Sequence, residues 1–279
     1  MKDILVAIDF SKGSTHALEY AIEIANLTLG NVIMVWVDNQ SILEVTLASE
    51  TSELREDAKK NLDELVKNYK DKLKPGKLTY KIRKGKVYQE LSAQAKQCEC
   101  TMLVAGTHGV TGFEEYWIGS NAARVVSYAP CPVITVKFNY EIARGYRRIL
   151  LPLDHTAQTI QKVHFTAELA KLSGADINIL ALNTSKLRTM QRVVENNVAK
   201  VEKYLNANGI SYVVDSIMTD NVAASIIAQA KNIDADLISI MTDWQNEVSV
   251  TILGQFAQQL VNYSPVPVLS IHPKDNFIL

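Results

Sequence analysis

Short apolar runs alternate with amphipathic segments along the first half of the chain. The apolar runs read ILVAI, NVIMVWV, LTYKIRK, TMLVAG and PVITV. The segments between them carry apolar residues at three- to four-residue spacing, which predicts helices at 14–27, 51–72, 88–97 and 120–128. Strand and helix in alternation predict an α/β fold with a parallel sheet and helices on both faces. ILVAI and VIMVWV are continuously apolar, as expected of strands buried on both faces.

The chain contains two copies of the same sequence pattern. DILVAID at 3–9 corresponds to RILLPLD at 148–154, an offset of 145, whereas APCPVITV at 129–136 corresponds to SPVPVLSI at 264–271, an offset of 135. The second copy has therefore lost ten residues in its middle. A polar segment containing Gly145 joins the copies, and we place two domains at 1–140 and 146–279.

The composition is that of a globular protein with two cores. The 279 residues are 47% hydrophobic and 21% charged, with a formal net charge of −1. This balance gives no reason to expect a nucleic-acid partner. No stretch has the roughly 18 consecutive apolar residues that suggest a membrane span, and the start, MKDILVAIDFSKG, lacks the apolar core of a signal peptide. A cytoplasmic location without a membrane partner is expected.

The three cysteines do not form a recognisable framework. Cys98 and Cys100 are separated by one residue, and Cys131 lies between two prolines. No paired spacing typical of a zinc site is present. We expect reduced cysteines that pack as small apolar residues.

One loop carries the candidate chemistry. Residues 106–121 read GTHGVTGFEEYWIGSN, directly after a predicted strand and directly before a predicted helix. A glycine at the strand end leaves room for a sugar, and glycines within the loop allow its N–H groups to point inward. The helix that follows offers free N–H groups and a positive dipole end to a phosphate. Taken alone, however, the glycines could simply mark a turn.

The motifs together resemble the universal stress protein family. The resemblance rests on ILVAIDFS, VIMVWV, GTHGVTG, GSNAARVV and APCPVITV, which cover nearly all of the first copy. It implies two tandem Rossmann-like domains of the adenine nucleotide alpha hydrolase type, each a five-stranded parallel sheet of order 3-2-1-4-5. It also implies that the glycine pattern binds ATP, or ADP or AMP, together with Mg²⁺.

Carried over position by position, the resemblance assigns a nucleotide site to the first copy. Adenine and ribose contacts fall on strand ends, and phosphate contacts fall on the loop and the helix start. The assigned residues are Ala7, Asp9, Ser11, Val37, Ala105, Gly106, His108, Gly109, Gly119, Ser120, Asn121 and Ala122. Asp9 is also the candidate ligand of the magnesium ion that accompanies the nucleotide.

Several of these residues have a plainer interpretation. Asp9 at a strand end could cap the next helix, and Val37 could be an ordinary core residue. His108 could be a solvent-exposed loop residue. These alternatives stay open at the level of sequence.

The second copy lacks most of the glycine pattern. It keeps Asp154 and Thr156, but Met241 and Trp244 stand opposite Gly106 and Gly109. Asp243 and Glu247 add negative charge that would repel phosphate, and Gln255 replaces the serine after the remaining glycine, Gly254. We therefore expect ATP in the first copy only, with the second copy a structural partner or the holder of another ligand.

The expected function is that of an ATP-binding regulatory protein of the stress response. No Walker lysine and no nucleophile elbow are present, so at most weak ATPase activity is expected and no catalytic residue is assigned. A slow ATP hydrolase or phosphotransferase and a nucleotide-independent interaction module are the alternatives. Each copy ends in an apolar strand that needs covering, which predicts an intrachain pseudo-dimer through the fifth strands, with a homodimer of tandem chains also open.

Overall fold

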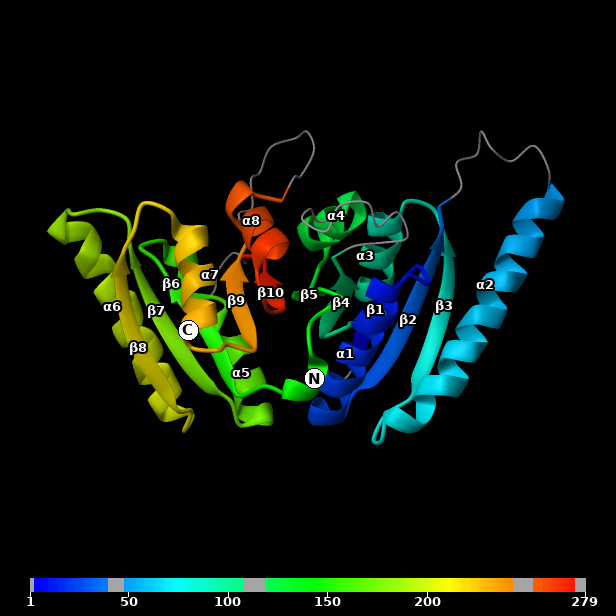
Figure 1. The fold of residues 1–279 in the computed structure, drawn as a ribbon, viewed down its shortest axis with the longest axis horizontal. Helices are drawn as coiled ribbons and strands as arrows, with labels where there is room; N and C mark the ends of the chain where they lie inside the picture. Colours follow the sequence, from blue (N-terminus) through cyan, green and yellow to red (C-terminus); the bar gives the residue numbers. More distant parts are fainter. Residues whose placement is uncertain (1–2, 40–47, 108–118, 243–252, 274–279) are drawn as a thin grey trace. The chain divides into compact units, whose positions relative to one another are not determined.

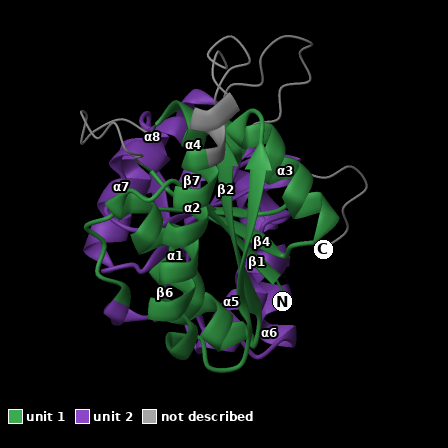
Figure 2. Cartoon of the chain, turned by 90° about the vertical axis from the view of Figure 1, so that its right-hand side faces the viewer, with its two compact units in different colours: residues 1–142 green, residues 143–279 purple. Residues whose placement is uncertain are grey.

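The chain forms two compact units, residues 1–142 and 143–279 (Figures 1 and 2). The computed structural model describes residues 3–39, 48–107, 119–242 and 253–273. Each unit repeats the same alternation of strand and helix. The prediction of two tandem α/β domains is confirmed.

The first unit is a five-stranded parallel sheet. Its strands pair in the order β3-β2-β1-β4-β5, which confirms the predicted order. The strands are β1 (Asp3–Ile8), β2 (Asn31–Asp38), β3 (Leu78–Lys84), β4 (Met102–Gly106) and β5 (Val133–Val136). The helices are α1 (Lys12–Thr28), α2 (Ala48–Tyr69), α3 (Val87–Gln97) and α4 (Ser120–Tyr128), with the 3-10 turn η2 (Lys70–Lys72). A further 3-10 turn, η3 (Ile142–Arg144), spans the division of the chain between the two units.

The core of the first unit is built on β1 and β4. Ile4, Leu5 and Val6 are fully buried, and β1 pairs with β2 on one side and with β4 on the other. Figure 2 shows α1 and α2 on one side of these strands and α3 on the other. The chain runs outward from β1 to β3 and then returns to β4, so the strand order reverses between β1 and β4. Ligands of open α/β sheets bind at the carboxyl ends of strands beside such a reversal.

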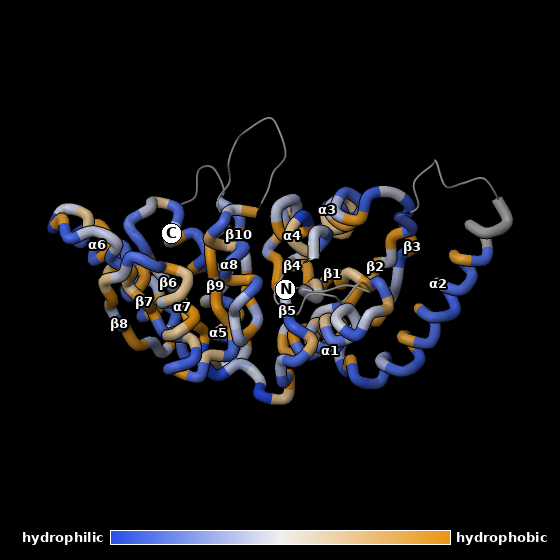
Figure 3. Tube along the Cα trace, turned by 45° about the horizontal axis from the view of Figure 1, so that its top comes forward, coloured by the Kyte–Doolittle hydropathy of each residue, from blue (hydrophilic) through white to orange (hydrophobic). Residues whose placement is uncertain are grey.

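Helix α2 carries its charges on the outside. Ala58 and Leu62 are buried against the sheet, whereas Glu56, Asp57 and Lys59 are exposed. Figure 3 shows the same division, with hydrophilic positions dominating this helix. The charged residues of α2 therefore form a solvated face of the helix. Within the described ranges, no helix combines the length and the apolar character that crossing a bilayer requires.

The second unit repeats the topology of the first. Its strands pair in the order β8-β7-β6-β9-β10. They are β6 (Arg148–Leu153), β7 (Asp176–Asn183), β8 (Tyr212–Met218), β9 (Leu237–Met241) and β10 (Val268–Ile271). The helical segments are η4 (Ala157–Ile160), α5 (Val163–Ser173), α6 (Arg188–Ala207), α7 (Val222–Asn232) and α8 (Gln255–Tyr263).

Two differences separate the copies. The segment that joins the second strand to the next helix is shorter in the second unit. There β7 ends at Asn183 and α6 begins at Arg188, whereas in the first unit β2 ends at Asp38 and α2 begins at Ala48. The predicted loss of residues therefore falls between the second and third strands. The first helix also differs: α1 is continuous, but its counterpart is split into η4 and α5.

The expectation of reduced thiols is wrong for two of the three cysteines. Cys98 and Cys100 form a disulfide, while Cys131 is free. The intervening residue, Glu99, has a φ of 49°, a left-handed turn that follows the end of α3. This turn brings the two cysteine Cα atoms to 5.2 Å, a normal separation for a disulfide. The spacing in sequence did not reveal it because the turn depends on where α3 ends.

Candidate functional site

A pocket of ≈ 340 Å³ opens at the carboxyl ends of β1, β2 and β4 in the first unit. This volume is within the range of about 300 to 1,000 Å³ typical of small-molecule sites. It lies beside the reversal of strand order, where the topology predicts a ligand. The sequence-predicted site residues that line it are Ala7, Asp9, Val37, Ala105, Gly106, Gly119, Ser120, Asn121 and Ala122.

Asp9 shapes the turn that follows β1. Its Oδ1 accepts a hydrogen bond from the Ser11 N–H at 3.0 Å, and the Asp9 N–H donates to Ser14 Oγ at 3.3 Å. Between them, Phe10 has a φ of 63°, a left-handed conformation that is uncommon for a bulky residue. Its ring lies 6.3 Å from that of Trp36. The Asp9 carboxylate is thereby fixed at the pocket wall.

Ser11 does not line the pocket. It is the N-cap of α1, where its Oγ accepts from the Ser14 N–H at 3.1 Å. The capping role that the sequence left open for Asp9 thus belongs to Ser11. An N-cap of this kind typically contributes about 1 kcal/mol to the stability of its helix. Ser11 supports the site through the turn that presents Asp9.

The end of β2 supplies an apolar wall and a polar rim. Val35, Trp36 and Val37 line the pocket, followed by Asn39. Asp38 between them is 5% exposed and accepts a hydrogen bond from Arg55 Nε of α2 at 3.0 Å. This ion pair fixes the strand end and keeps the Asp38 carboxylate occupied. The wall therefore offers apolar contacts, which suit a planar base better than a phosphate.

Gly106 is required by packing, not by an approaching sugar. A Cβ at this position would lie 2.8 Å from both the carbonyl carbon and the oxygen of Gly13, which belong to the backbone of α1. Backbone atoms cannot move aside as a flexible side chain can. The physical reason given for Gly106 from sequence is therefore corrected: its missing Cβ lets α1 pack closely against the end of β4.

Gly119 has no such packing requirement. A Cβ there would have Thr107 O as its nearest neighbour, at the ordinary distance of 3.5 Å, and its φ of −56° suits any residue. Nothing in the described protein requires glycine at this position. The open space beside Gly119 belongs to the pocket.

Gly106→Ala is expected to destabilise the first unit by about 1 to 3 kcal/mol, because the new methyl group overlaps the backbone of α1. Gly119→Ala is the matched control and should change the free energy of unfolding by less than about 0.5 kcal/mol. Urea denaturation of both variants provides the measurement. Equal stability of the two variants would show that Gly106 does not carry the contact with α1.

The start of α4 presents N–H donors to the pocket that have no partner within the helix. Its N-cap is Gly119, which has no side chain with which to cap the helix. The first bond of the helix runs from the Ala123 N–H to Gly119 O. The N–H groups of residues 120–122 consequently have no partner within the helix. Free N–H groups and the positive end of a helix dipole together favour an anion.

Thr107 closes the base of the loop between β4 and α4. It is 2% exposed, its N–H donates to Val136 O at 3.1 Å, and its O accepts from the Gly119 N–H at 2.9 Å. These bonds hold the start of α4 at the end of β4. His108 and Gly109, which were predicted to contact the nucleotide, lie outside the described residues.

Sequence reasoning missed several residues of the pocket. Thr107 and Asn39 directly follow strand ends, so the rule that places ligands at carboxyl ends could have found them. Ser14 is reached through the turn after β1. Val87 and Leu91 come from α3, and no pattern in the sequence marks that helix as part of the site.

The corresponding turn of the second unit is organised differently. Asp154 Oδ1 accepts from both the N–H and Oγ1 of Thr156, at 2.8 and 2.6 Å. Asn197 of α6 is 5% exposed and its Nδ2 donates to Asp154 O at 2.9 Å. Met241, opposite Gly106, ends β9, and Gly254 is the N-cap of α8. The predicted contributions of Asp243, Trp244 and Glu247 lie outside the described residues.

A buried lysine distinguishes this turn further. Lys162 is 3% exposed, and its Nζ donates to Thr159 O at 2.7 Å and to Thr159 Oγ1 at 3.2 Å. Burial lowers the pKa of Lys162 to about 8, although the charge of Asp154 acts in the opposite direction. The first copy has Ala17 at this position. In the second unit, a buried amine therefore lies next to the turn that follows β6, where the first unit has the methyl group of Ala17.

Both copies of the pattern match one family model. The model, described as the universal stress protein family, covers residues 1–137 and 145–272. The universal stress protein YxiE of Bacillus subtilis is 27% identical over 146 residues, which are 48% of this chain and 97% of that protein. The universal stress protein MJ0531 of Methanocaldococcus jannaschii is 31% identical over 139 residues, 49% of this chain and 82% of that protein.

A solved structure matches almost the whole chain. The crystal structure of a universal stress protein from Archaeoglobus fulgidus superposes with a TM-score of 0.81, covering 97% of this chain and 98% of its own. The sequence identity is 19%, so the likeness shows the shared fold alone.

Proposed function

Because the chain belongs to the universal stress protein family over both of its halves, we propose that it is an ATP-binding regulatory protein whose first unit holds the nucleotide. The observation that carries the proposal is the pocket at the ends of β1, β2 and β4, which joins an apolar wall to the open N-terminus of α4. Such a combination suits a molecule with a planar apolar end and an anionic end.

The adenine end is assigned to the apolar wall. Ala7 and Val37 flank the base, and Trp36 adds aromatic surface beside it. Ala105 and Gly106 lie along the ribose. In this arrangement the sugar is contacted by the backbone of the strand end, because the Cβ position of Gly106 faces α1.

The phosphates are assigned to the start of α4. The N–H groups of Ser120, Asn121 and Ala122 serve as donors, and the Ser120 hydroxyl and the Asn121 amide add side-chain contacts. The space beside Gly119 admits a phosphate, since no packing contact demands a glycine there. His108 and Gly109 stay predictions of the sequence for the same phosphates.

A magnesium ion fits this donor set beside the phosphates. Mg²⁺ prefers hard oxygen ligands and binds through one or two carboxylates together with phosphate oxygens. The Asp9 carboxylate, fixed by the Ser11 N–H, is the ligand that the pocket offers. When bound, the ion neutralises phosphate charge, and the role of Asp9 is to hold it.

Retention of the nucleotide, not its hydrolysis, is the proposed role. Asp9 is the one ionisable side chain among the described residues that line the pocket. Phosphoryl transfer depends on cationic groups and a positioned base or water-orienting residue around the reacting phosphate. We therefore assign no catalytic residue. In the second unit, the side chain of Met241 stands where the first unit has Gly106, which argues against ATP at the corresponding strand end.

Thermal unfolding of the full chain with and without ATP and Mg²⁺ tests the proposed function. A ligand that binds the folded state at 100 times its dissociation constant stabilises it by about 2.7 kcal/mol. We expect a saturable rise of the melting temperature with ATP, ADP or AMP. The absence of any rise with all three would contradict the proposal and favour a nucleotide-independent interaction module.

A further inference from the structure

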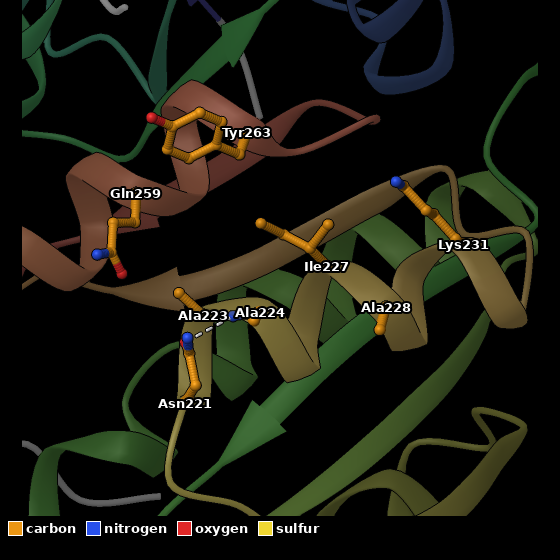
Figure 4. A pocket seen from close by; sticks show the side chains of 8 residues that line it. All are labelled: Asn221, Ala223, Ala224, Ile227, Ala228, Lys231, Gln259 and Tyr263. Carbon is orange, nitrogen blue, oxygen red and sulfur yellow. Dashed lines mark hydrogen bonds between the residues drawn. The ribbon is translucent and has the colours of Figure 1, made fainter. Parts of the chain in front are cut away.

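A second cavity lies between α7 and α8 of the second unit, on a different part of the fold from the strand-end site. It has a volume of ≈ 480 Å³. Figure 4 shows Tyr263 and Gln259 projecting from α8, with Ile227 and Lys231 on the neighbouring α7 and Ala223 near its start. Tyr263 is 47% exposed. This cavity, which we call the groove, is thus open and largely apolar, with the amine of Lys231 at one end.

The first copy shows what the same two helices hold when this space is filled. At the constant offset of 135, α3 corresponds to α7 and α4 corresponds to α8. Both α3 and α7 have 11 residues, and both α4 and α8 have 9. In the first unit the ring of Tyr88 packs on that of Tyr128, with centroids 4.7 Å apart and planes tilted by 43°. The guanidinium carbon of Arg124 lies 5.7 Å from the centroid of Tyr88.

The second copy keeps one half of this stack and has lost the other. Tyr263 stands where the first copy has Tyr128, but Ala223 replaces Tyr88 and Gln259 replaces Arg124. Ser92, which donates to Tyr128 O at 3.0 Å, is replaced by Ile227. Removing one ring and its covering cation leaves a slot beside the remaining tyrosine. The slot is more apolar than its counterpart, because an isoleucine stands in place of a serine.

The missing ring identifies the kind of occupant. A planar aromatic group can take the position of Tyr88 and stack on Tyr263, as the first unit does within its own chain. Aromatic pairs in tilted or offset geometry gain about 0.5 to 1.5 kcal/mol beyond the area that they bury. An aliphatic occupant of equal size would gain only the burial.

The amine at the end of the groove adds a charge requirement. Lys231 is exposed and forms no ion pair with the described residues. Ala223, Ile227 and Lys231 stand on successive turns of α7, with Cα atoms about 6 Å apart along its axis. A ring over Ala223 and Ile227 therefore needs a short spacer to bring an anionic group to the lysine. A carboxylate on a chain of two or three carbons spans that distance.

We propose that the groove between α7 and α8 is a binding site for a small arylalkanoic acid, with its ring on Tyr263 and its carboxylate at Lys231. The proposal is independent of nucleotide binding, because the two pockets share no lining residue. It gives the second unit a ligand site of its own, outside the region that corresponds to the phosphate cradle.

Titration of the full chain with 3-(4-hydroxyphenyl)propionate, followed by amide chemical shifts, tests the proposal. We expect saturable shifts confined to α7 and α8. The neutral amide of the same acid should bind about two- to fivefold more weakly, the effect of losing an exposed ion pair. The non-aromatic 3-cyclohexylpropionate should bind about two- to tenfold more weakly, because it cannot stack.

Two reciprocal variants locate the site. Ala223→Tyr restores the residue of the first copy and should abolish the shifts by filling the slot. Tyr88→Ala opens the equivalent slot between α3 and α4, where Lys96 corresponds to Lys231, and should create a second set of saturable shifts there. Lys231→Gln should reduce affinity for the acid to that for the amide. Unchanged amide spectra elsewhere establish that each variant is folded.

Several outcomes would overturn the proposal. They are no saturable shift with the acid, equal affinity for the cyclohexyl acid, or shifts that persist in Ala223→Tyr. Shifts at α7 and α8 with a peptide containing an aromatic and an acidic residue, but none with the free acid, would also overturn it. That result would make the groove a docking surface for a polypeptide.

Discussion

Gly119→Val is expected to weaken binding of ATP and Mg²⁺ to the chain by at least about tenfold. The isopropyl group would occupy the space beside the start of α4, where the phosphates are proposed to lie. Losing one hydrogen bond to a charged group costs about 1.5 to 3 kcal/mol, which corresponds to tenfold or more in affinity. The change should leave the fold intact, because the Cβ position is 3.5 Å from its nearest neighbour and the φ of −56° suits any residue. Isothermal titration calorimetry provides the measurement.

The tandem chain supplies a matched control for this variant. Gly254 is the N-cap of α8, with φ and ψ of −54° and 147°, almost those of Gly119. Gly254→Val introduces the same group at the same structural position of the second unit. It should leave the affinity for ATP unchanged if the nucleotide binds in the first unit only. A loss of affinity in Gly254→Val, or none in Gly119→Val, would place the site elsewhere.

The second large effect concerns Lys162. Its pKa falls from 10.5 to about 8 in the folded state because the side chain is buried. Between these values the unfolded chain binds more protons than the folded one, so stability rises with pH. The cost of holding the charged amine is fully present below pH 8 and is relieved as pH rises towards 10.5. This lowering of the Lys162 pKa corresponds to a change of roughly 3 kcal/mol in the free energy of unfolding.

Lys162→Met removes this dependence while keeping an unbranched side chain of similar length. The free energy of unfolding of the wild type, relative to the variant, should therefore rise by roughly 3 kcal/mol between pH 7.5 and 10.5. Denaturant titrations across this range provide the measurement. Lys171→Met, at an exposed position of α5, should run parallel to the wild type. Parallel curves for Lys162→Met as well would mean that the buried amine does not titrate in this window.

Local pattern was sufficient to predict the α/β class and the duplication, but not the order of the strands. The apolar runs at β1 and β2 read as strands buried on both faces because they are, and the duplication of DILVAID as RILLPLD located the first strand of each copy. The strand order came from the family resemblance, since periodicity alone does not determine which strands are neighbours. The predicted helix boundaries agree with those of the structure to within a few residues. Helix α4, for example, begins at Ser120 in the structure, as the sequence predicts.

The lining of the pocket was predictable where it lies on strand ends and unpredictable where it depends on packing between elements. Asp9, Val37 and Ala105 follow from the rule for open sheets and from the resemblance. The true constraint on Gly106 is the backbone of α1 at Gly13, a contact across 93 positions that no local pattern encodes. The buried Lys162 and the Cys98–Cys100 disulfide were missed for the same reason, since each depends on how a helix begins or ends.

The most direct test of the central claim is the number of ATP molecules that one chain binds. Equilibrium dialysis of the wild-type protein against ATP and Mg²⁺, at concentrations well above the dissociation constant, gives this number. We predict one nucleotide per chain, held by the pocket of the first unit at Asp9 and the start of α4. Two nucleotides per chain would contradict the asymmetry between the copies, and none would contradict the site itself.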